Sequence, residues 1–451
     1  MRLTFRCFIA CVAAALMGWC AAPARAQSLL ELYDSARGYD AAYQSALAQA
    51  RASQARADQA RAGLLPQLAL QAGAQRNFME LAVSGLGSGN SDYNVQSAML
   101  NGSQPLYRPA NRIAWGQGRK QAELAQVQLS GVEQDLIVRL SQAYFDVLAA
   151  QDALRYVRAL KAAVAGQLDA ARRNFEVGNA TITDSREAQA RFDLAVAQEI
   201  AAENDLRVKK LALDQLTGHA GSQPRPLAQP IVLPAPQPDD AQAWVDRAMQ
   251  EHPAVLQNRM ALELARMETA KARTGHLPTV DLQASVGQQR YPNGNPTLSV
   301  APGMNYHYRA SVASVGVALN WPLFAGFAVE GRVRETLALE DKARADLDDA
   351  ERTVSQATRV AFFGVQSGLG QVKALEAAEQ SSLTALQANQ LGYKVGVRIN
   401  IDVLNAQSQF YQTQRDLSKA RYDALVGLLR LKQASGVLQA EDLTPINRLL
   451  D

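Results

Sequence analysis

The chain switches between two patterns of apolar and polar positions, and the first predicts unusually long helices. Residues 28–62 are rich in Ala, Leu, Arg and Gln and contain no Pro, a composition that favours a helix. The same helical pattern covers residues 110–175, 181–217, 241–275, 327–391 and 400–434. A helix of about 60 residues extends roughly 90 Å, far beyond a globular helix, so we expect these helices to pair along their length. Because many of the apolar positions are Ala, we expect a thin layer of closely packed helices.

The second pattern alternates apolar and polar residues and predicts four β-strands. It covers residues 67–75, 280–287 and 314–321, and less regularly residues 93–104. Loops rich in Gly, Asn, Ser and Pro at 78–92 and 292–306 predict two hairpins, at about 66–107 and 278–324. The expected length of about 10–13 residues suits a tilted membrane strand, although a soluble antiparallel sheet shows the same alternation.

Four strands cannot close a barrel, and open sheet edges are not tolerated in lipid. A membrane location therefore requires several chains to share one barrel. Two chains would give eight strands with an interior filled by side chains, and three would give twelve strands with a wider lumen.

The two patterns occur twice in the same order. Residues 175–189 and 393–407 both have an aromatic residue, Val-Gly two positions later, then Asp and Ala-Gln at matching spacings. Gln104-Pro105-Leu106-Tyr107 likewise corresponds to Trp321-Pro322-Leu323-Phe324. We therefore expect an internal repeat, with repeat 1 at residues 27–218 and repeat 2 at 241–436. A Pro-rich connector at 219–240 separates the repeats, and a C-terminal segment follows at 437–451.

The first 26 residues have the pattern of a secretory signal peptide. Arg2 and Arg6 precede an apolar stretch, and Ala24-Arg25-Ala26 forms an A-x-A cleavage site. Cys20 would allow a lipoprotein, but Trp19 stands where a small residue is needed. Cleavage after Ala26 removes all three cysteines and three arginines without any acid, so the formal charge falls from +3 to about zero. Nothing then favours a nucleic-acid partner.

The remaining sequence gives little support for an enzyme. No apolar run after residue 26 approaches the length of a membrane-spanning helix. The four histidines are dispersed and do not pair at metal-ligand spacing. We expect no catalytic residues, no metal site and no cofactor.

The duplicated Val-Gly segment, the two Pro-Leu-aromatic segments, Ala143-Tyr144-Phe145 and Leu216-Thr217-Gly218 together resemble the TolC family of outer-membrane channel proteins over residues 27–440. The resemblance implies an α+β membrane protein that forms a homotrimer. Each protomer would give four transmembrane strands to a shared 12-stranded barrel and long helices to a coiled-coil barrel in the periplasm. Such proteins serve as the exit duct for export from a Gram-negative cell, together with a periplasmic adaptor protein and an inner-membrane ABC or proton-driven pump.

The resemblance also implies the roles of the duplicated segment. Gly178 and Gly396 would lie in the two helix–helix turns at the periplasmic tip, near 176–181 and 393–399, because Gly suits such turns. Asp402 matches an acidic residue that narrows the closed entrance. Asn405 stands where the family has a second acid, so the chain departs from the family pattern there.

The residues matching the family's tip latch are Thr183, Asp184, Tyr393 and Arg398, and we expect Asp184 to hold the other turn. Asp184 and Asp402 also suit the first turn of a helix, where a negative charge complements the macrodipole. Arg398 also suits a solvated surface.

Two other functions remain open at this stage. One is a periplasmic coiled-coil adaptor without a pore, which the four amphipathic strands disfavour. The other is a surface adhesin, for which the two hairpin loops are short. The exported cargo, the type of pump and the resting state of the channel do not follow from the sequence.

Overall fold

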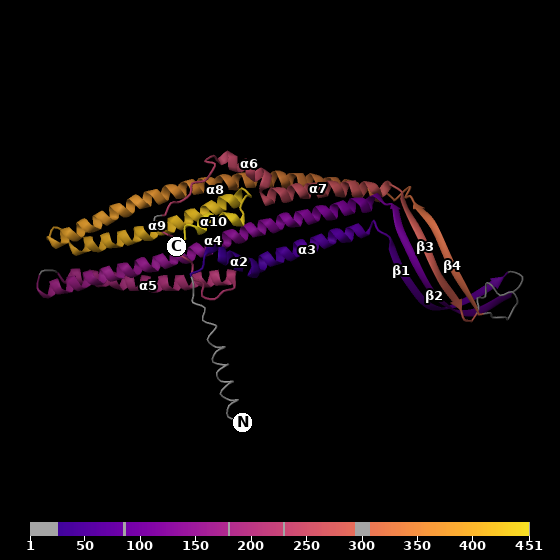
Figure 1. Ribbon diagram of the computed structural model, residues 1–451, viewed down its shortest axis with the longest axis horizontal. Coiled ribbons are helices and arrows are strands. Elements are labelled where there is room, and N and C mark those ends of the chain that lie inside the picture. Colours follow the sequence, from indigo (N-terminus) through magenta and orange to yellow (C-terminus); the bar gives the residue numbers. More distant parts are fainter. Residues whose placement is uncertain (1–25, 84–86, 179–180, 229–230, 294–306, 451) are drawn as a thin grey trace, which may run out of the picture. The chain divides into compact units, whose positions relative to one another are not determined.

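The computed structural model describes residues 26–450, except 84–86, 179–180, 229–230 and 294–306 (Figure 1). The expected signal peptide therefore lies outside the described residues apart from Ala26, and so does most of the expected loop at 292–306. Within the described part of the chain, no helix is both long enough and apolar enough to cross a membrane.

Long helices make up most of the chain. They are α2 (Leu29–Tyr39), α3 (Ala41–Ala62), α4 (Pro109–Glu176), α5 (Ile182–Thr217), α6 (Ala241–Glu251), α7 (Pro253–Arg273), α8 (Ala328–Lys394), α9 (Asn400–Ala434) and the short α10 (Leu443–Asn447). Single-turn 3₁₀ helices occur at Thr274–His276 and Ala440–Asp442. The expectation of very long helices is confirmed, since α4 has 68 residues and α8 has 67.

Two of the expected helices are each broken into two, so their prediction as continuous helices was wrong. Asp40 leaves the helical conformation between α2 and α3, and its carboxylate accepts a hydrogen bond from the Tyr43 N–H at 2.8 Å. The second break lies at His252, which is extended, and Pro253 then begins α7. Proline suits the first helical position because its missing N–H would have had no partner in the helix.

Four strands form one antiparallel sheet in the order β1-β2-β3-β4. They are β1 (Gln67–Val83), β2 (Gly87–Tyr107), β3 (Thr279–Tyr291) and β4 (Tyr308–Asn320). The expected length of 10–13 residues holds for β3 and β4, which have 13 each, but β1 has 17 and β2 has 21.

Apart from residues 84–86, which lie outside the described residues, the expected loop at 78–92 was wrong, because these residues belong to β1 and β2. Pairing of β1 with β2 continues from Phe78 opposite Asp92 to Val83 opposite Gly87. Arg76 forms an ion pair with Asp92 across the two strands. Antiparallel pairing uses backbone groups, so the Gly, Ser and Asn residues that suggested a loop still extend the strands.

The described residues divide into two compact units. The second unit comprises Ala48–Gln128 and Leu256–Ala350, and the first comprises the described residues up to Leu47, Leu129–Val255 and those from Glu351 onward. Each of the helices α3, α4, α7 and α8 contributes to the second unit, together with the whole sheet.

The first unit contains the largest buried cluster, which joins segments far apart in sequence. Leu29 and Leu32 of α2, Tyr144 of α4, Leu425 of α9 and Ile446 of α10 all belong to it. The connector at 219–240 packs beside this cluster: the Tyr144 hydroxyl donates to the Arg225 carbonyl oxygen at 3.0 Å. Isolated bridges pair Gln27 with Pro224 and Leu227 with Leu450. The described residues of the connector contain no helix, as its prolines predict.

In the second unit the helices lie side by side in the order α3, α4, α7, α8. A Cβ on Gly118 of α4 would approach the Ala60 Cβ of α3 to 3.0 Å, so the small residues allow these helices to pack closely. An ion pair between Lys120 and Glu263 (2.9 Å) links α4 to α7, and one between Arg332 and Glu268 (2.8 Å) links α7 to α8. This order matches the strand order, because α3 leads into β1, α4 follows β2, α7 leads into β3 and α8 follows β4.

Candidate functional site at the helix turns

Two helix–helix turns of the first unit contain the duplicated sequence segment. After α4, Gly178 has φ 80°, and its N–H donates to the Phe175 carbonyl oxygen at 3.0 Å. After α8, Gly396 has φ 81°, and its N–H donates to the Tyr393 carbonyl oxygen at 3.2 Å. Only glycine adopts this left-handed conformation without strain, which explains why the Val-Gly pair occurs in both turns.

The second turn also requires a second glycine. The Val397 and Arg398 N–H groups both donate to the Gly392 carbonyl oxygen, at 2.9 and 3.2 Å. A Cβ at Gly392 would come within 2.7 Å of the Arg398 Cγ. The turn therefore folds the Arg398 side chain back over the end of α8.

Asp184 caps the helix on which it lies. Its carboxylate accepts hydrogen bonds from the Thr181 N–H at 3.0 Å and from the Thr181 hydroxyl at 2.8 Å. In return, the Asp184 N–H donates to the Thr181 hydroxyl oxygen at 3.3 Å. This reciprocal capping box satisfies N–H groups that a helix start leaves free. Thr183 is exposed in the same first turn.

The residues of the second turn pair differently. The Arg398 guanidinium lies 3.7 Å from the Asp402 carboxylate, in the first turn of α9. The Tyr393 hydroxyl accepts a hydrogen bond from the Asn174 side chain at 3.2 Å, which links α8 to α4. Within the described residues, the link expected from Asp184 to Arg398 and Tyr393 is therefore not formed in this chain, and the latch role stays a prediction.

A buried asparagine lies where the two helix pairs, α4–α5 and α8–α9, meet. Asn400, the first residue of α9, is 2% exposed. Its side-chain oxygen accepts a hydrogen bond from the Gln167 amide of α4, and its side-chain nitrogen donates to the Asp184 carbonyl oxygen of α5 at 3.4 Å. One side chain of α9 is thus bonded to both helices of the other pair.

Asn405 makes a further link between the pairs. Its side-chain oxygen accepts a hydrogen bond from the Arg191 guanidinium of α5 at 2.9 Å. Below these polar links, Leu404 is fully buried against Val164, Leu168 and Ala188. The two helix pairs are therefore held near the turns by one small apolar cluster and by amide contacts.

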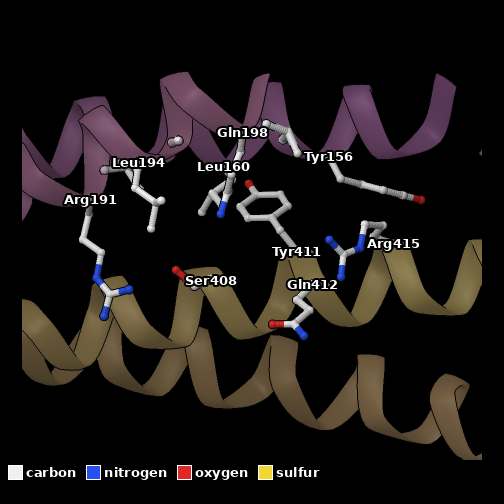
Figure 2. A pocket seen from close by; sticks show the side chains of 12 residues that line it. Tyr156, Leu160, Arg191, Leu194, Gln198, Ser408, Tyr411, Gln412 and Arg415 are labelled. Atoms are coloured by element: carbon white, nitrogen blue, oxygen red, sulfur yellow. The ribbon is translucent and has the colours of Figure 1, made fainter. Parts of the chain in front are cut away.

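A cavity of about 380 Å³ lies beside this contact, between α4, α5 and α9. Figure 2 shows the Tyr411 ring pointing from α9 toward the other two helices, with Arg191 reaching from α5 toward α9. Among the residues that line the cavity, Arg191 and Arg415 carry charge and no acid is present. The cavity separates the two helix pairs between Leu404 and Ser418, whose hydroxyl is hydrogen-bonded to the Tyr156 hydroxyl of α4 at 3.1 Å.

The sequence identified the turn glycines but missed the contacts between the helix pairs. Gly178 and Gly396 lie between the helices of each pair, and their place at a periplasmic tip stays a prediction. Gln167, Asn174, Arg191 and Asn400 were not singled out, because isolated amides and arginines in long polar helices have no distinctive spacing. The roles of Asp402 and Asn405 in narrowing an entrance stay predictions.

The chain matches a known family over most of its length. The family model described as outer membrane efflux protein matches residues 32–219 and 244–437. The chain is 32% identical to the outer membrane protein TolC of Vibrio cholerae over 433 residues, 96% of each protein. It is 31% identical to the alkaline protease secretion protein AprF of Pseudomonas aeruginosa, covering 93% of this chain and 86% of AprF. It is also 31% identical to Escherichia coli TolC, covering 94% and 85%.

Solved structures share the fold at lower identity. The outer membrane protein VceC of Vibrio cholerae matches with a TM-score of 0.76 and 19% identity, over 90% of this chain and 96% of VceC. The CmeC outer membrane channel of Campylobacter jejuni matches with a TM-score of 0.78 and 16% identity, over 94% and 90%. The arrangement of long helices with a four-stranded antiparallel sheet is thus that of outer-membrane channels.

Proposed function

The chain belongs to the outer membrane efflux protein family and serves as an exit duct in the outer membrane of a Gram-negative bacterium, and we propose that three copies form one channel. The family is a transport family and not an enzyme family.

The observation that carries the proposal is the four-stranded sheet with two open edges. Among the described strands, β1 and β4 each have a single strand neighbour. In lipid every backbone N–H and C=O needs a partner, so β4 of one copy pairs with β1 of the next. Three copies give twelve strands, and twelve strands leave a wider lumen than eight.

The faces of the sheet suit this arrangement. Leu68, Leu70, Val315 and Val317 share one face and are exposed in the single chain. The opposite face carries Gln, Asn and Ser, including Ser285 and Ser314, whose hydroxyls are hydrogen-bonded at 2.8 Å. An apolar face toward lipid and a polar face toward the lumen is the pattern of outer-membrane strands.

In this proposal the two helix–helix turns bind a periplasmic adaptor protein. The adaptor connects the channel to an inner-membrane pump. Val177 in the first turn and Val395, Val397 and Ile399 in the second are exposed. Exposed apolar side chains at adjacent turns are a feature of protein-binding surfaces. AprF, one of the relatives, is named for secretion of an alkaline protease.

Asp402 and the latch residues control the entrance in this proposal. Three Asp402 carboxylates around one axis form a ring that favours cations, and Arg398 partly neutralises each carboxylate through its ion pair. Replacing Tyr393 by Phe and Arg398 by Ala together should raise the conductance of the purified channel, because the contacts to Asn174 and Asp402 are lost. Unchanged conductance in this double variant would remove the latch role.

The mature chain begins at Gln27 in this proposal. The Gln27 N–H donates to the Gln223 carbonyl oxygen at 2.8 Å, and the Gln27 carbonyl oxygen accepts from the Arg225 N–H at 3.2 Å, so this residue is already anchored in the first unit. Mass spectrometry of protein from the outer-membrane fraction tests the boundary. An acylated Cys20 at the N-terminus would overturn it.

The central experiment measures the mass and the conductance of the purified protein. Native mass spectrometry should give three chains, and planar bilayers should show discrete conductance steps. A membrane-inserted monomer, or a trimer without conductance, would contradict the proposed channel.

A further inference from the structure

The apolar face of the sheet ends in two arginines that lie directly opposite each other. Side chains alternate between the two faces of a strand, so the face that carries Val315 also carries Arg290 of β3 and Arg309 of β4. These two arginines are cross-strand partners, and both are exposed. Directly opposite residues of an antiparallel pair have Cβ atoms about 4.5–5.5 Å apart, and like charges in that position repel each other.

No acid compensates this pair within the described residues. In that part of the chain, neither guanidinium forms an ion pair or a hydrogen bond. The sequence that joins the two arginines, residues 291–308, contains no Asp or Glu. Arg76 lies on the same face of β1, but it is paired with Asp92 of β2. Arg290 and Arg309 therefore leave two positive charges side by side on the surface of the sheet.

Neutral hydrogen-bonding side chains flank the two arginines on the same face. Gln96 of β2 lies opposite Arg290 on its other side, and Gln288 lies opposite Ser311 one step nearer the helices. All three are exposed, and within the described residues their side chains have no hydrogen-bond partner. Gln96, Gln288, Arg290, Arg309 and Ser311 are here called the arginine surface. Guanidinium groups with neighbouring polar donors are the chemistry that binds a phosphate.

The arginine surface lies at the end of the sheet that is remote from the helices. All four helices of the second unit join the other end, and Arg290 and Arg309 are each the second residue from the free end of their strand. Leu319, the last apolar residue of β4, comes ten positions after Arg309, which is about 34 Å along a strand. At a tilt of about 40° this becomes about 26 Å along a barrel axis, close to the height of about 25 Å of the apolar band. With the helices in the periplasm, the arginines reach the headgroups of the outer leaflet.

The apolar face also contains a shallow hollow of about 340 Å³. Most of its lining belongs to this face, including the small residues Gly102 and Ala284 and the larger Leu100 and Val286. Val286 lies four positions from Arg290 on β3, which is about 13 Å along the strand. A fatty acyl chain is long enough to reach this hollow from a headgroup that is bound at the arginines.

We propose that the arginine surface binds a phosphate group of lipid A, the phosphorylated and acylated glycolipid that anchors lipopolysaccharide in the outer leaflet. The inference rests on the proposed barrel, because it takes the apolar face of the sheet as the outer surface. The phosphate lies between the two guanidinium groups and replaces their mutual repulsion with charge-assisted hydrogen bonds. An acyl chain of the same lipid lies in the hollow. Each chain has one such site.

The position of the arginine surface favours a lipid over a free phosphate ion. A free ion would meet only exposed side chains, in competition with water, whereas the phosphate of a lipid is already held at this height in the membrane. The acyl chains of the lipid add apolar contact with the sheet. Basic surfaces beside a membrane commonly bind anionic lipid headgroups, and lipopolysaccharide is the main anionic lipid of the outer leaflet in Gram-negative bacteria.

Native mass spectrometry of the purified full-length channel, titrated with diphosphorylated lipid A in detergent, tests the site. The Arg290→Gln/Arg309→Gln variant should bind the lipid about tenfold more weakly than the wild type, because it loses the charge-assisted hydrogen bonds. Arg290→Lys/Arg309→Lys keeps the charge without the guanidinium fork and should lose less. The matched control, Arg51→Gln/Arg61→Gln, removes the same charge from exposed positions on α3, outside the strands, and should bind like the wild type.

Three further probes identify the source of the phosphate. Lipid A without its phosphates should bind to the wild type as weakly as the intact lipid binds to the Arg290→Gln/Arg309→Gln variant. Neither inorganic phosphate nor phosphatidylglycerol in excess should displace intact lipid A. Displacement by inorganic phosphate would indicate a site for the free ion and overturn the lipid site. Tighter binding of phosphatidylglycerol than of lipid A would overturn the choice of the glycolipid.

The outcomes separate the lipid site from the proposed trimer. Equal affinity of the wild type and of Arg290→Gln/Arg309→Gln for lipid A would overturn the site. Loss of the trimer in that variant would show that the arginines pair with an acid of the next copy, such as Glu80 near the free end of β1, and would also overturn it. A native mass of one chain for the wild type, with arginine-dependent binding of lipid A, would contradict the trimer and leave the lipid site standing, because the arginine surface belongs to a single chain.

Discussion

Replacing Asn400 by Ala should loosen the contact between the two helix pairs of the first unit. The side chain is 2% exposed and is bonded to Gln167 of α4 and to the Asp184 carbonyl oxygen of α5. A net hydrogen bond contributes about 0.5–1.5 kcal/mol, and a buried polar group left without a partner costs about 1–3 kcal/mol. Two lost bonds therefore weaken the contact by about 1–3 kcal/mol per chain.

This loss of contact free energy is large enough to shift the balance between a narrow and a wide entrance measurably. If the entrance widens when the helix pairs separate, the equilibrium shifts toward the wide form by about 5- to 150-fold per chain. The purified Asn400→Ala channel in planar bilayers should therefore spend more time at high conductance. Asn389→Ala is the matched control, because Asn389 is only half-buried and donates a hydrogen bond to the Ala385 carbonyl oxygen of its own helix.

A double-mutant cycle tests the contact itself. Gln167→Ala alone should act in the same direction as Asn400→Ala, and the two together should do less than the sum of their effects, because they remove one shared bond. Conductance equal to that of the wild type in the Asn400→Ala channel, or the same increase in the Asn389→Ala control, would refute the role of this contact.

Three further changes test other parts of the molecule. Asp402→Ala should weaken the preference for cations, measured as a smaller reversal potential in a salt gradient, whereas Asn405→Ala should change it little; an intact preference in Asp402→Ala would leave the aspartate as a helix-end residue. Burial lowers the pKa of His252, whose ring nitrogen accepts the Ala254 N–H at 3.1 Å, so its contribution to stability is present above the unfolded pKa of about 6.5 and is lost as the pH falls. His252→Gln should therefore flatten the fall in melting temperature between about pH 7 and pH 5, and an unchanged slope would exclude this histidine as its cause. Leu404→Ala, at a fully buried position, should destabilise the protein by about 2–5 kcal/mol in denaturant unfolding, and a loss below about 1 kcal/mol would show that the apolar cluster does not hold the helix pairs.

Local sequence was enough to predict the long helices and their turns. An Ala-rich run stays helical because each residue favours the helix independently of its neighbours in space. Gly178 and Gly396 mark the turns because a positive φ is a property of the residue itself. Composition was misleading at 78–92, where backbone pairing between neighbouring strands outweighs the low strand preference of Gly and Asn.

Contacts between distant segments could not be predicted in this way. The break at Asp40 depends partly on Arg139, whose guanidinium lies 3.1 Å from the Asp40 carboxylate although the two are 99 positions apart. Asn400 meets Gln167 across 233 positions, and Asn405 meets Arg191 across 214. Such pairs depend on how one helix is aligned against another, and this alignment cannot be read from the spacing of residues along either helix.

The buried cluster of the first unit also bears on the order in which the chain can fold. Leu29 and Leu32 are covered by a cluster that includes Leu443 and Ile446, which are synthesised and exported roughly 400 residues later. Until those residues arrive, part of the apolar surface of α2 has no cover, and such exposed surface favours aggregation. Closing a contact over so long a stretch of chain is also slow. We therefore expect the segment exported first to need protection from aggregation until the end of the chain reaches it.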